Sequence, residues 1–190
     1  MMAFREMIVS ETLSPEKTKT GFMCMYPYKW MFNSCRIPVT GEDVAKSYDP
    51  ATHQHVVVIR NGHFFIVDLV NKLTGKELSV AEIELQLQRI VEDERTQQVN
   101  PVPIGSFTAA NRDEWVKNRE ALLAGATGEH NRKLLELVES GIIVLNLDST
   151  SPVTFQERGE AVYGGDARNR VFVLDLVVVC ETGSSGFSAE

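Results

Sequence analysis

The chain has 190 residues, of which 43% are hydrophobic and 24% are charged, so it can bury a core and is long enough for one domain. Its formal net charge of −7 argues against a nucleic-acid partner, because phosphate binding needs clustered Lys and Arg, and the basic residues here are scattered among acidic ones. We find no apolar run near the roughly 18–20 residues that cross a bilayer. No signal-peptide pattern opens the chain, and we expect an intracellular protein.

Cysteine and histidine spacing predicts no metal site. The three cysteines have no metal-type spacing, and we expect reduced, mostly buried thiols at Cys24, Cys35 and Cys180. Two histidines, His53 and His55, share one face of a predicted strand, with His63 across a hairpin, but no Cys or carboxylate of suitable spacing accompanies them. We therefore expect these histidines to be surface or structural residues.

The first quarter of the chain gives weak secondary-structure signals. Residues 1–20 form a mixed, polar lead-in with a turn or helix start at Ser14-Pro15. Residues 21–38 are dense in methionine and aromatic side chains, and we expect them to be buried, as core in preference to a ligand pocket. Residues 39–53 turn polar around Gly41 and indicate a surface connection.

Residues 55–80 carry the strongest local signal. Two β-rich runs, 55–60 and 63–68, flank Asn61-Gly62, the dipeptide that a type I′ hairpin turn requires. Ser79 and Glu82 then form a capping-box pattern, which predicts a helix over about 80–94.

The second half of the chain alternates helix and strand patterns. We expect a short strand at 103–107, a helix capped by Asn111 that carries Trp115, and a helix at about 130–140. An apolar run at 142–147 is typical of a strand buried on both faces. A helix at 152–163, ended by Gly164-Gly165, and a strand at 170–180 complete the order, which predicts an α/β fold with a mixed β-sheet and packed helices.

Two polar clusters remain open to more than one interpretation. Ser149-Thr150-Ser151 follows a predicted buried strand, where a nucleophile or anion-binding hydroxyls can lie, but Pro152 favours hydroxyls that cap the next helix. Asn169-Arg170 heads the last long strand, where the arginine could pair with a carboxylate, and spacing alone favours a solvated side chain. No histidine lies in a nucleophile–base pattern, so the residues alone supply no complete catalytic set.

Four ordered blocks resemble one enzyme family. They are MCMYPYKWMFNSCRIP at 23–38, HVVVIRNGHFFIVD at 55–68, PIGSFT followed by NR and W at 103–115, and GG followed by NR at 164–170. Together they are similar to the carnitine/choline acyltransferases, most closely the carnitine acetyltransferases. The resemblance implies a CoA-dependent, chloramphenicol acetyltransferase-like domain that is incomplete here, with residues 1–20 as a lead-in and residues 21–190 as part of the family's N-terminal catalytic domain.

The resemblance also implies where the chemistry lies. In the family a histidine takes the proton from the carnitine hydroxyl, and the oxygen attacks the thioester carbonyl of acyl-CoA. Residues 186–190 match the first half of the motif that carries this histidine, so we expect the base directly after Glu190, with the chain ending inside a hairpin. The base is then none of the histidines of this chain: His53, His55, His63 and His130. We expect no catalytic residue in the chain, and three site-supporting residues: Asn169, Arg170 and Glu190.

Substrates and partners follow from the same resemblance. Acyl-CoA is expected as a co-substrate with no permanently bound cofactor, and carnitine and acyl-CoA as the ligands of a monomeric full-length enzyme. The sequence leaves open carnitine or choline, the acyl length, and a mitochondrial, peroxisomal or cytosolic location.

One stretch departs from the family pattern. After Asn-Arg the family continues Trp-x-Asp-Lys, whereas this chain has Val171-Phe172-Val173-Leu174. Because the base that the resemblance implies follows Glu190, we expect the 190 residues alone to be inactive. The alternative function is a non-catalytic α/β binding or interaction domain derived from the family.

Overall fold

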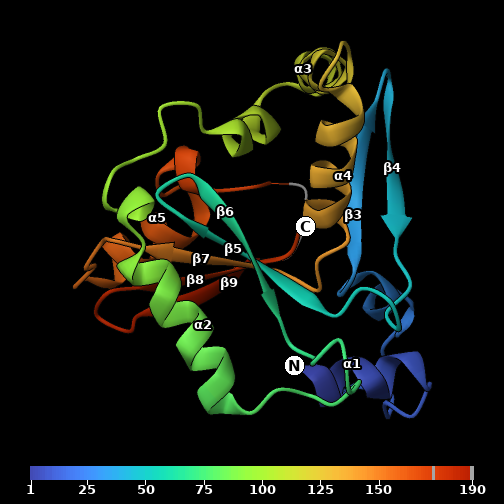
Figure 1. Cartoon of the computed structure of the whole chain (residues 1–190). Helices are drawn as coiled ribbons and strands as arrows, with labels where there is room; N and C mark the ends of the chain where they lie inside the picture. The colour runs from blue at the N-terminus through green and yellow to red at the C-terminus, as the bar shows by residue number, and fades with distance from the viewer. Residues whose placement is uncertain (173, 189–190) are drawn as a thin grey trace.

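A five-stranded mixed sheet organises the computed structural model, which describes residues 1–172 and 174–188 (Figure 1). The strand order is β6-β5-β7-β8-β9. Strands β5, β7 and β8 are parallel, and an antiparallel strand closes each edge. The strands are β5 (His55–Arg60), β6 (His63–Asp68), β7 (Val144–Asp148), β8 (Leu176–Cys180) and β9 (Ser185–Ser188). The expected mixed α/β sheet is confirmed.

The hairpin at the sheet edge forms where its turn dipeptide predicts. Strands β5 and β6 pair from His55 with Asp68 to Arg60 with His63. Asn61 and Gly62 have φ of +49° and +76°, the left-handed conformation that a type I′ turn requires at both central positions. The turn therefore sets the register of the edge pair.

Helices cover both faces of the sheet. On one face Val57, Ile59, Val144 and Val178 form a buried cluster against which Val138 packs, and on the other face Val56, Val58 and Val67 pack with the helix residue Ile90. The helices are α1 (Met2–Val9), α2 (Val80–Glu92), α3 (Arg112–Leu123), α4 (Gly128–Glu139) and α5 (Phe155–Tyr163). None of the helices in the described ranges is long and apolar enough to cross a membrane.

Side-chain caps fix the starts of three helices. Ser79 and Glu82 form the predicted capping box of α2, and the Asn111 side chain accepts a hydrogen bond from the Asp113 N–H at the start of α3. Helix α5 has a capping box of its own, built by Thr154 and Glu157. The prediction that Ser149-Thr150-Ser151 caps this helix is therefore wrong, because the cap lies three residues further along.

Two short hairpins precede the sheet. They are formed by β1 (Lys17–Thr18) with β2 (Gly21–Phe22), and by β3 (Ser34–Val39) with β4 (Glu42–Ser47). The prediction of a surface connection at 39–53 missed β4. Five of the six β4 residues are exposed, so the strand lacks the apolar alternation that would have marked it. Gly41, at φ +88°, makes the turn.

The expected burial of residues 21–38 is wrong for most of the segment. Phe22 and Tyr26 are 68% and 63% exposed, because this part of the chain forms β2 and the 3₁₀ helix η1 (Tyr26–Trp30) outside the main sheet. The Lys29 ammonium lies over the rings of Tyr26 and Trp30, which gives these exposed aromatics cation–π partners.

Two predicted strands take other forms. Residues 103–107 lie mainly in the 3₁₀ helix η3 (Ile104–Ala109), and the strand expected at 170–180 begins only at Leu176. Further 3₁₀ helices are η2 (Glu94–Gln97) and η4 (Ala167–Asn169). Sheet pairing starts at Leu176, opposite Val144. Apolar residues before Leu176 pack from a loop: Val171 and Leu174 are buried although they belong to no strand.

Candidate active-site ion pair

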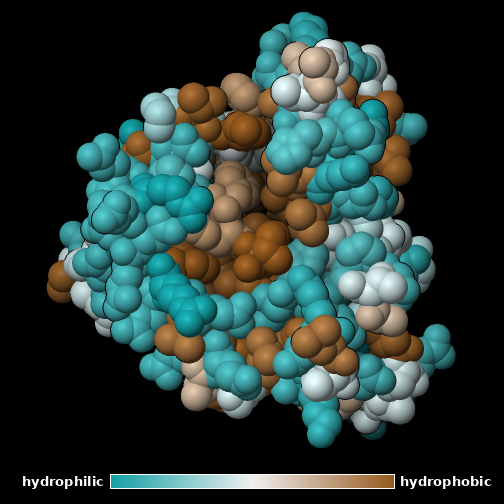
Figure 2. Space-filling view, in the orientation of Figure 1, coloured by the Kyte–Doolittle hydropathy of each residue, from teal (hydrophilic) through white to brown (hydrophobic). Residues whose placement is uncertain are grey.

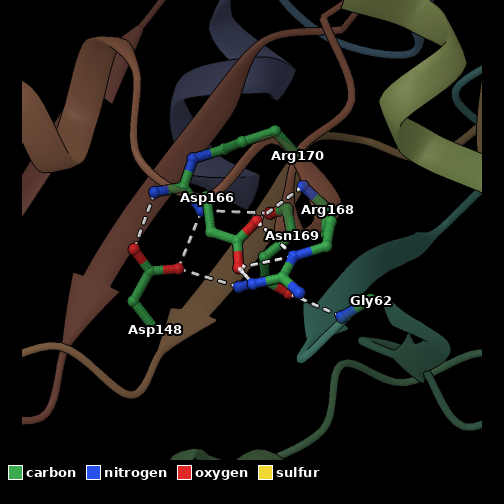
Figure 3. Close-up of polar contacts among 6 residues, drawn as sticks. All are labelled: Gly62, Asp148, Asp166, Arg168, Asn169 and Arg170. Atoms are coloured by element: carbon green, nitrogen blue, oxygen red, sulfur yellow. Dashed lines mark hydrogen bonds and ion pairs between the residues drawn. The ribbon is translucent and has the colours of Figure 1, made fainter. Parts of the chain in front are cut away.

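Arg170 and Asp148 form a buried bidentate ion pair (Figure 3). The guanidinium donates from Nη1 to Asp148 Oδ1 at 2.7 Å and from Nη2 to Asp148 Oδ2 at 2.6 Å. The same two nitrogens also donate to the carbonyls of Asn169 and Ala161. The spacing-based interpretation of Arg170 as solvated is wrong, because its side chain is 0% exposed. The alternative, a carboxylate partner, is the arrangement that the structure contains.

Asn169 ties this pair to the β5–β6 turn. Its Nδ2 donates to Asp148 Oδ1 at 2.8 Å, and its Oδ1 accepts from the Gly62 N–H at 3.1 Å (Figure 3). Asp148 therefore receives donors from both residues of the Asn-Arg dipeptide. The cluster joins the end of β7, the end of η4 and the hairpin turn, three segments that lie far apart in the sequence.

Local structure brings Asn169 and Arg170 to Asp148. Asp166 accepts from the Arg168 N–H and so caps η4, which ends at Asn169. Gly165 precedes the cap at φ +52°, and a Cβ there would collide with Arg170 Nη2 and the Ala161 carbonyl. Glycine is required at this position for both its conformation and its size.

The chain beyond Arg170 packs tightly against η3. A Cβ on Gly105 would collide with the Arg170 carbonyl, and the Phe172 N–H donates to Thr108 Oγ1 at 2.8 Å. These contacts hold the backbone on the C-terminal side of the ion pair, where it leads toward β8.

A buried ion pair is weak evidence for stability, because desolvation of both charges offsets their attraction. The Asp148–Arg170 pair is more informative as a candidate functional feature, because buried charged groups with specific partners often lie at functional sites. Asp148 was not among the predicted site residues. The signal that could have found it is an acidic residue directly after an apolar strand, the end of the sheet where ligands of α/β folds gather.

A second buried polar cluster is formed by Tyr48, Glu139 and Arg119, with Cys35 of β3 close to it. Tyr48 donates its hydroxyl to Glu139 Oε2 at 3.0 Å, and Arg119 pairs with the same carboxylate. Burial raises the pKa of the Cys35 thiol to about 12, and burial together with Glu139 raises the pKa of Tyr48. The Cys35 thiol and the Tyr48 hydroxyl are therefore neutral at physiological pH and are unsuited to act as nucleophiles there.

The histidines have structural or surface surroundings. His55 is buried and donates from Nε2 to the Leu137 carbonyl at 2.7 Å, while burial lowers the pKa of its imidazole. His53 Nδ1 forms a hydrogen bond with the Asp49 carbonyl, and His130 is exposed on α4. Across the described ranges no three His, Cys, Asp or Glu side chains gather as a metal site.

Of the two remaining candidates, the structure describes Ser149-Thr150-Ser151 but not Glu190. Ser149-Thr150-Ser151 follows β7, and within it Thr150 contacts Cys180 Sγ at 3.7 Å and accepts the Glu181 N–H at its carbonyl. Glu190, the third predicted site-supporting residue, lies outside the residues that the structure describes.

Comparison with known proteins identifies the family. Residues 1–190 match the family model of the choline/carnitine O-acyltransferases. Human carnitine O-acetyltransferase is 29% identical over 205 residues, which cover 100% of this chain and 32% of the human protein. Choline O-acetyltransferase of Drosophila melanogaster is 32% identical, over 84% of this chain and 23% of its own length.

A further relative is of another kind. The highly reducing polyketide synthase LtbA of Aspergillus luteorubrus is 33% identical over 181 residues, which cover 92% of this chain and 5% of the synthase. The chain thus spans about a third of the carnitine O-acetyltransferase and a small part of the synthase. Because the family match covers the whole sequence, the chain belongs to the choline/carnitine O-acyltransferase family.

Proposed function

We propose that this chain is part of the catalytic domain of a carnitine O-acyltransferase, with a chloramphenicol acetyltransferase-like fold, that transfers an acyl group between CoA and carnitine. The family match along residues 1–190 is the observation that carries the proposal. The carnitine O-acetyltransferases of human and pigeon, each aligned over 100% of this chain, support carnitine as the acceptor and acetyl as one acyl group.

The proposed reaction exchanges a thioester for an ester. A histidine base removes the proton from the carnitine hydroxyl, and the oxygen attacks the thioester carbonyl to give a tetrahedral oxyanion. Collapse of this intermediate breaks the carbon–sulfur bond and expels the CoA thiolate. The thiolate takes up the proton that the base holds, so the base ends the cycle neutral.

The base in this proposal follows Glu190 and is supplied by none of the four histidines of the chain. The surroundings of His55 support this part, since its Nε2–H is used by a backbone carbonyl inside the fold. Glu190 is proposed as a site-supporting residue on the same segment as the base.

Asn169 and Arg170 are proposed as positioning residues. Arg170 is anchored by Asp148 and begins the segment that leads into β8, and β8 pairs with β9 from Leu176 opposite Ser188. We expect the anchored Arg170 to help orient the segment that leads into β8 and so, through the β8–β9 pairing, the strand that leads to the proposed base. The oxyanion donors would come from outside this chain.

The experiment begins with the coding sequence. If the codons after Glu190 lack a His-Ser-x-x-Asp-Gly type continuation, the proposed base does not exist. The continued protein is then assayed for CoA thiol release with acetyl-CoA and carnitine, and with choline in place of carnitine. Release that depends on carnitine and is lost when the new histidine is replaced by alanine supports the proposal.

A second candidate is a non-catalytic binding or interaction domain derived from the family. The observation that favours it is the replacement of the family's Trp-x-Asp-Lys by Val171-Phe172-Val173-Leu174 next to Arg170. A cooperative melt that neither CoA nor carnitine shifts, together with no CoA release by the continued protein, would favour this candidate.

A further inference from the structure

Strand β6 is an edge of the main sheet, and side chains cap its outward backbone groups at both ends. The Asp68 N–H donates to Gln86 Oε1 at 3.2 Å, and the Asp68 carbonyl accepts from Gln86 Nε2 at 3.0 Å. At the turn end the Gly62 N–H donates to Asn169 Oδ1 at 3.1 Å, and the Gly62 carbonyl accepts from Asn100 Nδ2 at 3.1 Å. Caps of this kind prevent a further strand from pairing where they lie.

Between these caps the edge is open at two residues. Antiparallel pairs alternate between those that exchange hydrogen bonds and those whose N–H and C=O groups point away from the partner strand. Asp68 is of the second kind, and Phe64 and Ile66 share its alternation. Within residues 1–172 and 174–188 the outward N–H and C=O groups of Phe64 and Ile66 have no hydrogen-bond partner. Ile66 is 38% exposed, so this part of the edge is accessible.

The open edge lies beside an apolar cavity of about 280 Å³. Figure 2 shows it near the middle of the view as a depression lined by hydrophobic side chains. Phe64 and Ile66 line it, together with residues of β3, η3, α3, α4 and the loop after Arg170. The two residues that offer open backbone groups therefore also place their side chains at the cavity.

The open edge and the cavity together specify the chemistry of an occupant. Donors and acceptors that recur at every second residue, about 7 Å apart, match the backbone of an extended polypeptide. A helical segment uses its own N–H groups internally and would leave Phe64 and Ile66 unsatisfied. A strand paired with β6 directs every second side chain to the face of Phe64 and Ile66, where the cavity can bury it.

We propose that β6 binds a short extended segment of a partner protein by strand addition, with one apolar side chain of that segment in the cavity. The caps at Gly62 and Asp68 confine the pairing to the stretch between them. Backbone hydrogen bonds then supply affinity, and the cavity selects the side chain. This binding is independent of the proposed acyl transfer, since it requires neither CoA nor carnitine.

A model peptide tests the pairing directly. The probe is acetyl-Lys-Val-Thr-Leu-Thr-Val-Lys-amide, which alternates apolar and polar side chains as a strand requires. Hydrogen exchange of the protein, followed residue by residue by NMR, should slow about tenfold or more at the amides of Phe64 and Ile66 when peptide is added, because the added strand pairs them. The amides of Phe65 and Val67 already point to β5 and should change little.

Matched peptides separate backbone pairing from side-chain burial. N-methylation at every second residue should abolish binding when it falls on the set that faces β6, whereas methylation of the alternate set should leave it nearly unchanged. Replacement of the central leucine of the peptide by alanine should weaken binding about tenfold, as expected when a buried side chain is truncated.

Matched protein variants test the location. Ile66→Pro removes an outward donor and leaves the β5–β6 bonds intact, because proline is tolerated on an edge strand where its nitrogen faces away from the ladder. It should weaken binding about tenfold. If this variant does not fold, Leu134→Lys places a charge at a cavity-lining residue that is 48% exposed, and should weaken binding as well. Val153→Lys, at a 74% exposed residue outside the cavity, should bind as the parent chain does.

Four outcomes would overturn the proposal. Two are the absence of added protection at Phe64 and Ile66 with saturating peptide, and binding that ignores both the methylation pattern and the folded protein variants. The third is binding by residues 1–190 but not by the protein continued beyond them, which would show that a segment of the same protein occupies the edge. The fourth is self-association of the chain that the peptide reverses, which would make a second copy the occupant.

Discussion

Asp148 and Arg170 meet through two parallel hydrogen bonds of 2.7 and 2.6 Å, with both side chains almost fully removed from solvent. The bidentate geometry fixes the orientation of the guanidinium as well as its position. Asn169 donates to the same carboxylate, so a single aspartate at the end of β7 organises the Asn-Arg dipeptide.

Removal of the charge on Asp148 should destabilise the protein strongly. In Asp148→Asn the Arg170 guanidinium remains buried without a counter-ion, and the free energy of unfolding should fall by about 3–5 kcal/mol. Urea denaturation measures this change. Asp166→Asn is the control, because Asp166 pairs with Arg168 at a half-exposed site, and its effect should be much smaller. Equal losses of unfolding free energy in the two variants would contradict a larger contribution of the buried pair to stability.

Replacement of both partners should recover much of that loss. Asp148→Leu with Arg170→Met removes both buried charges, and apolar replacements of buried ion pairs are often neutral or stabilising. The double variant should therefore be more stable than Asp148→Leu or Arg170→Met alone, as measured by the same denaturation. If the double variant loses the sum of the single losses, the two residues are not energetically coupled.

Asn146 should be a site for stabilisation. Its side chain lies on β7 at 0% exposure, and neither amide atom has a hydrogen-bond partner within residues 1–172 and 174–188. An unsatisfied buried amide costs about 1–3 kcal/mol, so Asn146→Val should raise the free energy of unfolding by a comparable amount. A lower melting temperature for this variant would show that a bound water or another group satisfies the amide.

His55 should make folding stability fall at acid pH. Burial lowers the pKa of its imidazole in the folded state, so below about 6.5 the unfolded chain takes up a proton that the folded chain does not. Stability is thus retained above pH 6.5 and lost as the pH falls. His55→Gln, whose amide can still donate to the Leu137 carbonyl, should show a shallower loss between pH 7 and pH 5, whereas His130→Gln on exposed α4 should follow the parent chain.

Local signals predicted much of the fold. Asn61-Gly62 determined a turn, and the Ser79–Glu82 pair determined a helix start, because each depends on residues adjacent in the chain. The exposure of residues 22–30 was missed, since aromatic composition indicates burial without saying whether a sheet lies close enough to cover the side chains. Thr154 was not predicted as the cap of α5, because the helix was expected to begin at Pro152, directly after the hydroxyls of Ser149-Thr150-Ser151.

The candidate site was predicted in part. Asn169 and Arg170 were identified through the family pattern, but spacing alone could not find a partner 22 residues earlier. That contact depends on the parallel pairing of β7 with β8 and on the Gly165 turn, neither of which a local pattern specifies. The apolar cavity lined by β3, β6, η3, α3, α4 and the loop after Arg170 was also absent from the sequence prediction, because only the folded chain brings these segments together.

We propose that the protein transfers an acyl group from CoA with a histidine base that follows Glu190. The measurement that tests this proposal is the release of CoA thiol from acetyl-CoA in the presence of carnitine, by residues 1–190 and by the protein continued beyond them. We expect carnitine-dependent release by the continued protein and none by residues 1–190. Sustained turnover by residues 1–190 alone would contradict it, because the base would then have to lie among the histidines already present.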